Sequence, residues 1–170
     1  MQEVGLQVPI ENAETAGLLV GDGQVALAHP LVESQVELLQ ARLAVPLVTN
    51  QIELNVLNLA PLHDGTLDQA QRLRMAPMAW SPLGGGSLFT RQTPQAARVA
   101  AALERMAPNY GTDAGGLALA WLLRLPSRPV PVLGTSRLDR LQAQAAAAAI
   151  ELDRQDWFAL YEASLGHEVP

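Results

Sequence analysis

The sequence predicts an α/β fold built around a parallel sheet. Four short apolar segments alternate with stretches of helical periodicity, which is the pattern of successive βα units. Of the 170 residues, 49% are hydrophobic and 16% are charged, which is enough apolar side chain for one sizeable core. No stretch has the composition of a linker, so a single domain over residues 1–170 is expected. The expected strands are Gln24–Ala28, Pro46–Ile52, Ala76–Trp80 and Val130–Gly134.

Helices are expected after each strand, and capping residues mark their ends. Thr66 and Gln69 have the spacing of a capping box, in which a hydroxyl and an amide satisfy free backbone N–H groups. Thr93 precedes a proline, which the first helical turn tolerates. Thr112 or Asp113 can cap the following helix. The expected helices are Glu33–Leu43 with an apolar face of Val36, Leu38, Leu39 and Leu43, Leu67–Leu73, Pro94–Met106, a segment from residue 112 or 113 to Leu125, Ser136–Ile150, and one that Asp153 caps and Gly166 ends.

A glycine-rich loop follows the third expected strand, in the segment MAWSPLGGGSLF at residues 78–89. The three consecutive glycines can turn through positive φ or let the backbone approach a ligand closely. Trp80 ends the strand directly before this loop. Its position alone leaves open whether the ring fills the interior of the fold or packs against a ligand.

The fourth expected strand runs directly into a segment rich in hydroxyls and arginines, TSRLDR at residues 135–140. A helix N-terminus presents unpaired N–H groups and partial positive charge, so hydroxyls and a guanidinium there can form a phosphate site. A capped helix with one solvated arginine is the alternative interpretation of the same residues. The residues alone leave both interpretations open.

Charge and composition exclude several classes of function. A formal net charge of −6 and a pI near 4.9 argue against nucleic-acid binding, which requires a basic face or stripe. Without cysteine there is no disulfide or thiolate nucleophile. His29, His63 and His167 lack metal-ligand spacing, and Gly86-Ser87-Leu88 lacks the pattern of a nucleophile elbow. The acidic start and the absence of a long apolar run predict no signal peptide, no membrane span and a cytoplasmic location.

Residues 21–26 match a G-x-G-x-x-A dinucleotide fingerprint, which needs a strand before it and a long helix after it. Pro30 arrives too soon for that helix. The Asp22-Gly23 pair is typical of a turn. We therefore expect a turn here rather than a Rossmann motif.

The chain resembles the C-terminal half of an aldo-keto reductase, most closely the bacterial oxidoreductase branch whose loop reads Met-Ala-Trp-Ser-x-Leu-Gly-Gly-Gly. The likeness extends from about Leu31 to Pro170, while residues 1–30 match poorly. It implies a partial TIM (β/α)8 barrel of about four βα units plus a C-terminal helix. Besides the loop, the matching segments are VTNQIE at 48–53, DGTLD at 64–68, AWLLRLPS at 120–127, QDWF at 155–158 and LGHEVP at 165–170.

The resemblance implies that NADP(H) binds here, and it assigns residues to the nicotinamide end of this cofactor. Trp80 would pack flat against the nicotinamide ring. Gln51, at the end of its strand, would hold the carboxamide with its side-chain amide. Ser81, Leu83 and Gly85 would follow the pyrophosphate.

The resemblance also assigns residues to the adenosine end. Ser136 and Arg140 would bind the 2′-phosphate of NADP, with Thr135 as a further contact. Gln144 would border the adenine. Arg137 is expected to face solvent.

The family's catalytic Asp, Tyr, Lys and His belong to the N-terminal half of the barrel, so no catalytic residue is assigned in this chain. The expected function is that of the NADP(H)-binding half of an oxidoreductase that would reduce a small aldehyde or ketone in its complete form. Two alternatives remain open. One is a non-enzymatic βα module that forms a homodimer through its open sheet edges, and the other is a truncated, nonfunctional fragment.

Overall fold

A five-stranded sheet forms the framework of the chain in a computed structural model that describes residues 18–21, 24–27 and 31–169. The strands follow one another in chain order, and β1 pairs antiparallel with β2 while all later pairs are parallel. The four parallel strands confirm the prediction of an α/β fold, whereas β1 was not predicted. The turn expected at Asp22-Gly23 lies outside the described residues. The strands are β1 Leu18–Gly21, β2 Gln24–Leu27, β3 Leu47–Glu53, β4 Met78–Trp80 and β5 Val130–Pro131.

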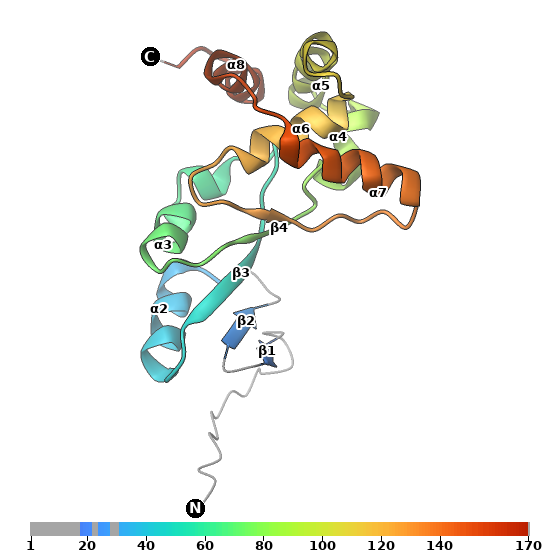
Figure 1. The fold of residues 1–170 in the computed structure, drawn as a ribbon. Coiled ribbons are helices and arrows are strands. Elements are labelled where there is room, and N and C mark those ends of the chain that lie inside the picture. The colour runs from blue at the N-terminus through green and yellow to red at the C-terminus, as the bar shows by residue number, and fades with distance from the viewer. Residues whose placement is uncertain (1–17, 22–23, 28–30, 170) are drawn as a thin grey trace, which may run out of the picture.

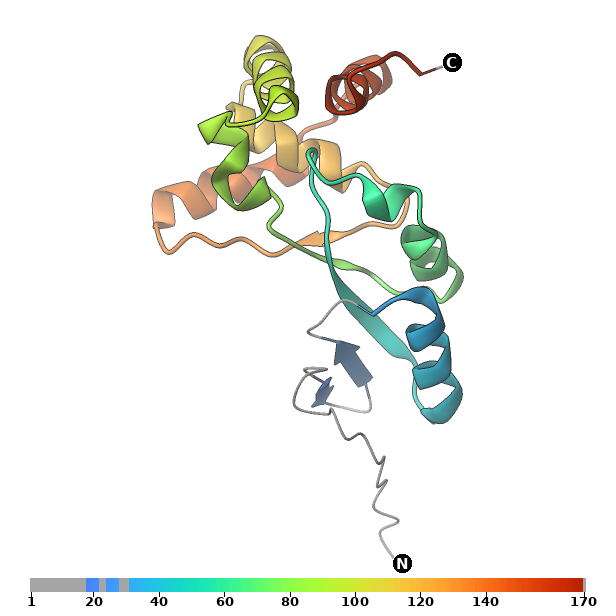
Figure 2. The same cartoon turned by 180° about the vertical axis from the view of Figure 1, so that it is seen from behind.

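Helices lie along one side of the parallel strands, and no described helix covers the other side (Figures 1 and 2). α5 and α8 pack side by side at the end of the molecule remote from β1. The α-helices are α2 Glu33–Arg42, α3 Thr66–Arg72, α4 Ser87–Thr90, α5 Pro94–Met106, α6 Ala114–Leu123, α7 Leu138–Ala145 and α8 Arg154–Leu165. Short 3-10 helices are η1 Ala60–Leu62, η2 Gly84–Gly86, η3 Ala107–Tyr110 and η4 Ala146–Ala149.

Three of the expected helix caps are confirmed by side-chain hydrogen bonds. The Thr93 hydroxyl accepts the N–H of Ala96 at 3.1 Å at the start of α5. Asp113, rather than Thr112, caps α6 by accepting the Gly116 N–H at 2.7 Å. Asp153 caps α8 in the same way. At the other end of α8, Gly166 takes a left-handed conformation with φ of 84°, as the C-cap prediction required.

The capping box predicted for α3 is wrong. Gly65 occupies the N-cap and Thr66 is already helical, and the carboxylate of Asp64 accepts the Thr66 N–H at 2.9 Å. Gln69 is buried and donates instead to the carbonyl oxygen of Glu33 at 2.8 Å. A buried amide needs a partner, and here a contact between two helices satisfies it rather than the local cap.

The apolar face predicted for the first helix is only partly confirmed. Val36 is fully buried, and Leu39 and Leu43 pack against the same small cluster. Leu38, however, is 62% exposed. The described part of the helix packs against a small cluster that includes Leu47 of β3 and Ala70 of α3, and Leu38 lies outside this cluster.

The last expected strand and the helix after it are both shorter than predicted. β5 contains two residues, although the Val132 N–H still donates to the Ala79 carbonyl at 2.8 Å. Pro131 has no N–H to donate, which limits regular pairing. α7 begins at Leu138 with Arg137 at its N-cap, so the helix does not begin at Ser136 as expected.

The pairing register separates the two faces of the sheet. Ile52 lies opposite Ala79, and both are buried on the face that the helices cover. Gln51 pairs with Met78 and Glu53 with Trp80, so these side chains alternate onto the other face. The covered face belongs to the main core, whose largest fully buried members include Leu54, Leu88, Leu103, Leu117, Trp121, Leu122, Leu152 and Leu160.

Candidate functional site

A hollow of about 630 Å³ lies where β4 and the β5 segment end. Ligands of parallel α/β sheets bind at these carboxyl ends, where loops rather than strands provide the contacts. The glycine loop forms one wall, and the segment from β5 to α7 forms the other. The lining residues are Trp80, Ser81, Pro82, Leu83, Gly85, Gly86, Phe89, Val132, Leu133, Gly134, Thr135, Arg140 and Gln144.

The glycine loop has the unusual backbone that its sequence predicted. Gly84, Gly85 and Gly86 have φ values of 63°, 58° and 93°. A side chain at Gly84 would also place its Cβ 2.9 Å from the Ser87 hydroxyl oxygen and 3.2 Å from a methyl carbon of Leu57. Both conformation and space therefore require glycine at position 84.

A buried asparagine that the sequence interpretation missed holds this loop in place. Asn55 is 1% exposed, and its Nδ2 donates to the Ser81 carbonyl oxygen at 3.0 Å. Its Oδ1 accepts the N–H groups of Leu57 and Asn58 at 2.8 and 2.9 Å. Asn55 thus ties the turn after β3 to the residue that follows β4. The signal in the sequence was an asparagine two residues beyond a strand, a position typical of side-chain-stabilised turns.

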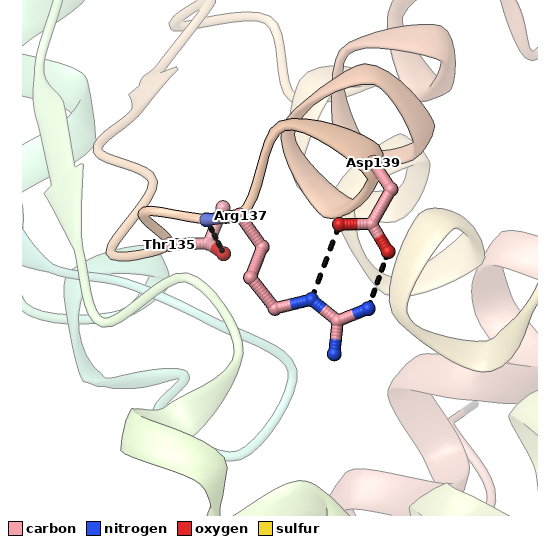
Figure 3. A network of polar contacts seen from close by, with 3 residues as sticks. All are labelled: Thr135, Arg137 and Asp139. Carbon is pink, nitrogen blue, oxygen red and sulfur yellow. Dashed lines mark hydrogen bonds and ion pairs between the residues drawn. The ribbon is translucent and has the colours of Figure 1, made fainter.

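The two arginines at the start of α7 have different surroundings. The guanidinium of Arg137 donates two hydrogen bonds to Asp139, at 3.1 and 2.5 Å, and its backbone N–H donates to the Thr135 hydroxyl at 3.2 Å (Figure 3). These bonds from Arg137 hold the pKa of the Asp139 carboxyl below its usual value. Arg140 forms no ion pair with any described residue and lines the hollow. Arg140 is therefore the cation that a ligand in the hollow can use.

The structure brings most of the predicted site residues together. Trp80, Ser81, Leu83, Gly85, Thr135, Arg140 and Gln144 all line the hollow. Gln51 is not among the lining residues, although its side chain lies on the same open face of the sheet as that of Trp80. Ser136 is exposed and also lies outside the lining, in the segment before α7 rather than in the helix as expected.

A smaller hollow of about 390 Å³ adjoins the first and shares Leu83, Phe89, Arg140 and Gln144 with it. The side-chain oxygen of Gln144 is buried and has no hydrogen-bond partner among the described residues. A buried polar atom without a partner is costly, so a ligand with a donor group would satisfy it. Phe89, which the sequence interpretation also missed, is an exposed aromatic directly after the glycine loop.

The chemistry of the lining suits a ligand that combines flat rings with an anionic group. Trp80 offers a half-buried aromatic face, and Arg140 is the one charged residue among the lining residues.

Within the described ranges, no group of three or more His, Cys, Asp or Glu side chains is arranged to hold a metal ion. In the same part of the chain, no helix is long and apolar enough to cross a membrane.

Comparison with known proteins identifies the class to which this fold and site belong. The sequence pattern of the Aldo/keto reductase family matches residues 26–164. The chain belongs to the aldo/keto reductase family of oxidoreductases.

Two relatives show how much of such a protein the chain represents. It is 47% identical over 146 residues to the 6-dehydroglucose reductase of Agrobacterium fabrum, which covers 86% of this chain and 43% of that protein. It is 43% identical over 142 residues to the oxidoreductase YdhF of Escherichia coli, which covers 81% of this chain and 46% of that protein. The chain therefore spans less than half the length of these two relatives.

Solved structures show the same fold. A thermostable aldo-keto reductase, solved with the inhibitor epalrestat, matches with a TM-score of 0.67 at 23% identity over 78% of this chain and 46% of its own. The aldose reductase of Giardia lamblia matches with a TM-score of 0.64 at 18% identity, over 82% and 44%. These matches confirm that the fold is part of an aldo-keto reductase TIM barrel, with an open sheet.

Proposed function

We propose that this chain is the NADP(H)-binding half of an aldo-keto reductase that reduces a small aldehyde or ketone. The observation that carries the proposal is the shared hollow, in which Trp80, the glycine loop and the unpaired Arg140 meet at the ends of two parallel strands. The relatives named as reductases and oxidoreductases support the class of reaction.

The cofactor fits the residues present. The ring of Trp80 would stack against the nicotinamide, and the loop at Ser81, Leu83 and Gly85, which lines the same hollow, would hold the pyrophosphate. Arg140 binds the 2′-phosphate, since its guanidinium is free of carboxylate partners among the described residues.

Two further assignments complete the proposed cofactor-binding site. The orphaned amide oxygen of Gln144 accepts a hydrogen bond from the adenine amino group. Gln51, on the same open face of the sheet as Trp80, would hold the carboxamide. Thr135 and Ser136 are assigned a supporting place near the phosphate.

The bound cofactor supplies the hydride, and this half of the barrel orients it. Among the described residues, the lining contains no Asp, Tyr, Lys or His, and the eleven Lys and Arg residues of the sequence are all arginine. We therefore assign proton delivery to residues outside this chain's hollow. With NADP(H) bound, Trp80 would hold the nicotinamide end and Arg140 the phosphate end, which would orient the cofactor for hydride transfer to a carbonyl carbon.

The test is a titration of the purified chain with NADPH and with NADH, followed by tryptophan fluorescence and by calorimetry. We expect saturable quenching by NADPH, because Trp80 lies in the hollow while Trp121 and Trp157 stack on each other in the core. Arg140→Gln should weaken NADPH binding about 10-fold or more and leave NADH binding unchanged, since a charge-assisted pair to phosphate contributes roughly 1.5–3 kcal/mol.

Arg137→Gln is the matched control, because it removes an arginine from the same helix start but outside the lining. It should leave both affinities unchanged. Equal loss of NADPH affinity in the two variants would contradict the assignment of Arg140. Absence of NADPH binding by a folded wild-type chain would contradict the proposed function itself.

Self-association through the open sheet edge is the second candidate function, and one observation favours it. Val130 on the edge strand β5 is 50% exposed, and Leu138 at the start of α7 is 68% exposed. Apolar surface on an unpaired edge favours pairing with another strand. Light scattering tests this candidate function. A stable dimer whose mass does not change with NADPH favours self-association, and a monomer that binds NADPH favours the reductase half.

A further inference from the structure

A third hollow lies at the opposite ends of β4 and β5 from the proposed cofactor site. It has a volume of about 420 Å³ and opens between the loop that enters β4 and the loop that enters β5. In TIM barrels the reaction takes place at the carboxyl ends of the strands, so a hollow at the amino ends belongs to no part of that chemistry. Its lining residues are Ala70, Gln71, Arg74, Met75, Ala76, Pro126, Ser127 and Arg128.

Two arginines border this hollow, and none of the described residues that line it is acidic. Arg74 and Arg128 form no ion pair with any described residue, whereas Arg72 is paired with Glu37 close by. Uncompensated positive charge is notable in a chain with a net charge of −6. The hollow therefore has the charge of an anion site.

Both arginines also occupy the same unusual backbone conformation. Their φ values are 54° and 50°, in the left-handed region that favours glycine. Each N–H closes a turn at the end of a helical segment, to Gln71 and to Leu125 respectively. Each of two adjacent loops thus places one arginine at the rim of the same hollow. Glycine would fit the backbone better at both positions.

A buried hydroxyl in the same lining is the independent observation that points to a ligand. Ser127 is 6% exposed, and its Oγ is buried without any hydrogen-bond partner among the described residues. A buried hydroxyl can donate one hydrogen bond and accept others, and leaving it unpaired is costly. An oxyanion bound in the hollow would accept a hydrogen bond from this hydroxyl, which lies in the lining together with Arg74 and Arg128.

We propose that this hollow binds one tetrahedral oxyanion of the phosphate class, held by Arg74 and Arg128 and by the hydroxyl of Ser127. Arginine suits this task because its planar fork of N–H donors matches phosphate oxygens. The ligand is inorganic phosphate or the phosphate group of a small metabolite. The site is separate from the proposed NADP(H) hollow, and the inference does not depend on cofactor binding.

A purely structural role for the arginines makes a different prediction. Both follow helix ends, whose partial negative charge attracts cations. If the arginines only complement the helix ends, their loss lowers the melting temperature and changes nothing in the presence of phosphate. If the arginines form a ligand site, their loss weakens the binding of phosphate.

The experiment is a phosphate titration of the full chain by NMR at constant ionic strength, with chloride as the balancing anion. We expect saturable shifts of the Ser127 amide and of the Nε–Hε signals of Arg74 and Arg128, with a midpoint in the millimolar range. The double variant R74Q/R128Q should bind at least about 10-fold more weakly. The control R105Q/R124Q removes two arginines that are exposed and outside the lining, and it should bind as wild type does.

Several outcomes would overturn the inference. Shifts that grow linearly with phosphate, shifts absent at Ser127, or equal weakening in both double variants would each contradict a defined site. The wild-type titration decides the matter even if a variant fails to fold. A parallel titration with glycerol 3-phosphate identifies the source: tighter binding than inorganic phosphate points to a phosphorylated metabolite, and equal binding points to the free ion.

Discussion

The two faces of the sheet differ in what covers them and in what their side chains do. On the helix-covered face, Ile52 and Ala79 lie opposite each other and are almost completely buried. On the open face, Glu53 lies opposite Trp80, and both side chains are only partly buried. A single residue along each strand separates the two environments, because side chains alternate across a strand. The covered face stabilises the chain, and the open face presents the candidate site.

The difference between the two faces is clear from two tryptophans, because Trp121 is buried in the core and Trp80 lines the hollow. Trp121 is fully buried beneath α8, where it stacks on Trp157 at 5.0 Å and exchanges indole N–H to carbonyl hydrogen bonds with it, at 3.1 and 3.0 Å. Trp80 has no such partner in the part of the chain that the structure describes, and it lines the hollow. Removing each ring should therefore affect different properties.

The largest effect is expected from Trp121→Ala. It removes a fully buried ring and leaves a cavity, so we expect the free energy of unfolding to fall by about 3–5 kcal/mol. The measurement is urea unfolding followed by circular dichroism.

Trp80→Ala makes the same chemical change on the open face and serves as the comparison. It should cost less stability than Trp121→Ala, because its ring is partly exposed, and it should abolish NADPH quenching. If both variants lost equal stability, the division between a stabilising face and a functional face would be wrong.

A smaller effect is expected at Asn55, which joins the covered core to the glycine loop. Asn55→Ala leaves the N–H groups of Leu57 and Asn58 without their acceptor and frees the Ser81 carbonyl. We expect a loss of about 2 kcal/mol in unfolding free energy, because buried donors lose their partners. NADPH affinity should also fall, since Ser81 is no longer held.

Asn58→Ala is the control for Asn55. Among the described residues, its side chain forms hydrogen bonds only with Glu53 and Ala60, so it does not hold the glycine loop. It should leave NADPH affinity unchanged. An equal loss of affinity in both variants would show that the whole turn, rather than Asn55, positions the loop.

The smallest effect is expected at Tyr110, where the covered side meets α8. Its hydroxyl donates to Asp156 at 2.6 Å and accepts the Asp153 N–H at 3.1 Å. Burial, and then the hydrogen bond to Asp156, raise the pKa of the Tyr110 phenol above its ordinary value of 10.0. Because the folded state favours the protonated phenol, its contribution to stability is complete below pH 10 and is lost as pH rises through the folded pKa.

Tyr110→Phe should therefore cost about 1 kcal/mol near neutral pH. The difference in unfolding free energy from wild type should shrink above pH 10, where the phenol ionises beside Asp156. Urea unfolding at several pH values measures this difference. A gap that stays constant across that range would contradict the assigned cause of the shift.

Sequence rules for turns and helix caps predicted the structure correctly where residues close together in the chain determine it. The three glycines turn through positive φ as predicted, and Thr93 and Asp113 cap their helices within three residues. The same rules failed at Gln69, which the spacing placed in a capping box. There a contact with Glu33, distant in sequence, provides a better partner for a buried amide.

The sequence predicted which segments form the candidate site, but not every residue that lines it. The sequence and its family resemblance indicated which segments meet, and Trp80 and Arg140 do line one hollow. The different positions of Arg137 and Arg140 were also predicted, since Arg137 is exposed and Arg140 lines the hollow. The exclusion of Ser136 was not predicted, because it depends on how the segment between β5 and α7 packs.

The sequence by itself determined the alternation of strands and helices, the glycine turn and the family, because these depend on periodicity, backbone preference and residue identity along the chain. The tertiary structure alone decided that Asn55 anchors Ser81, that Gln144 is left with an unpaired oxygen, and that Arg74 and Arg128 share one hollow. Each of these depends on how separate segments pack, and a buried polar group takes its partner from whichever segment lies beside it.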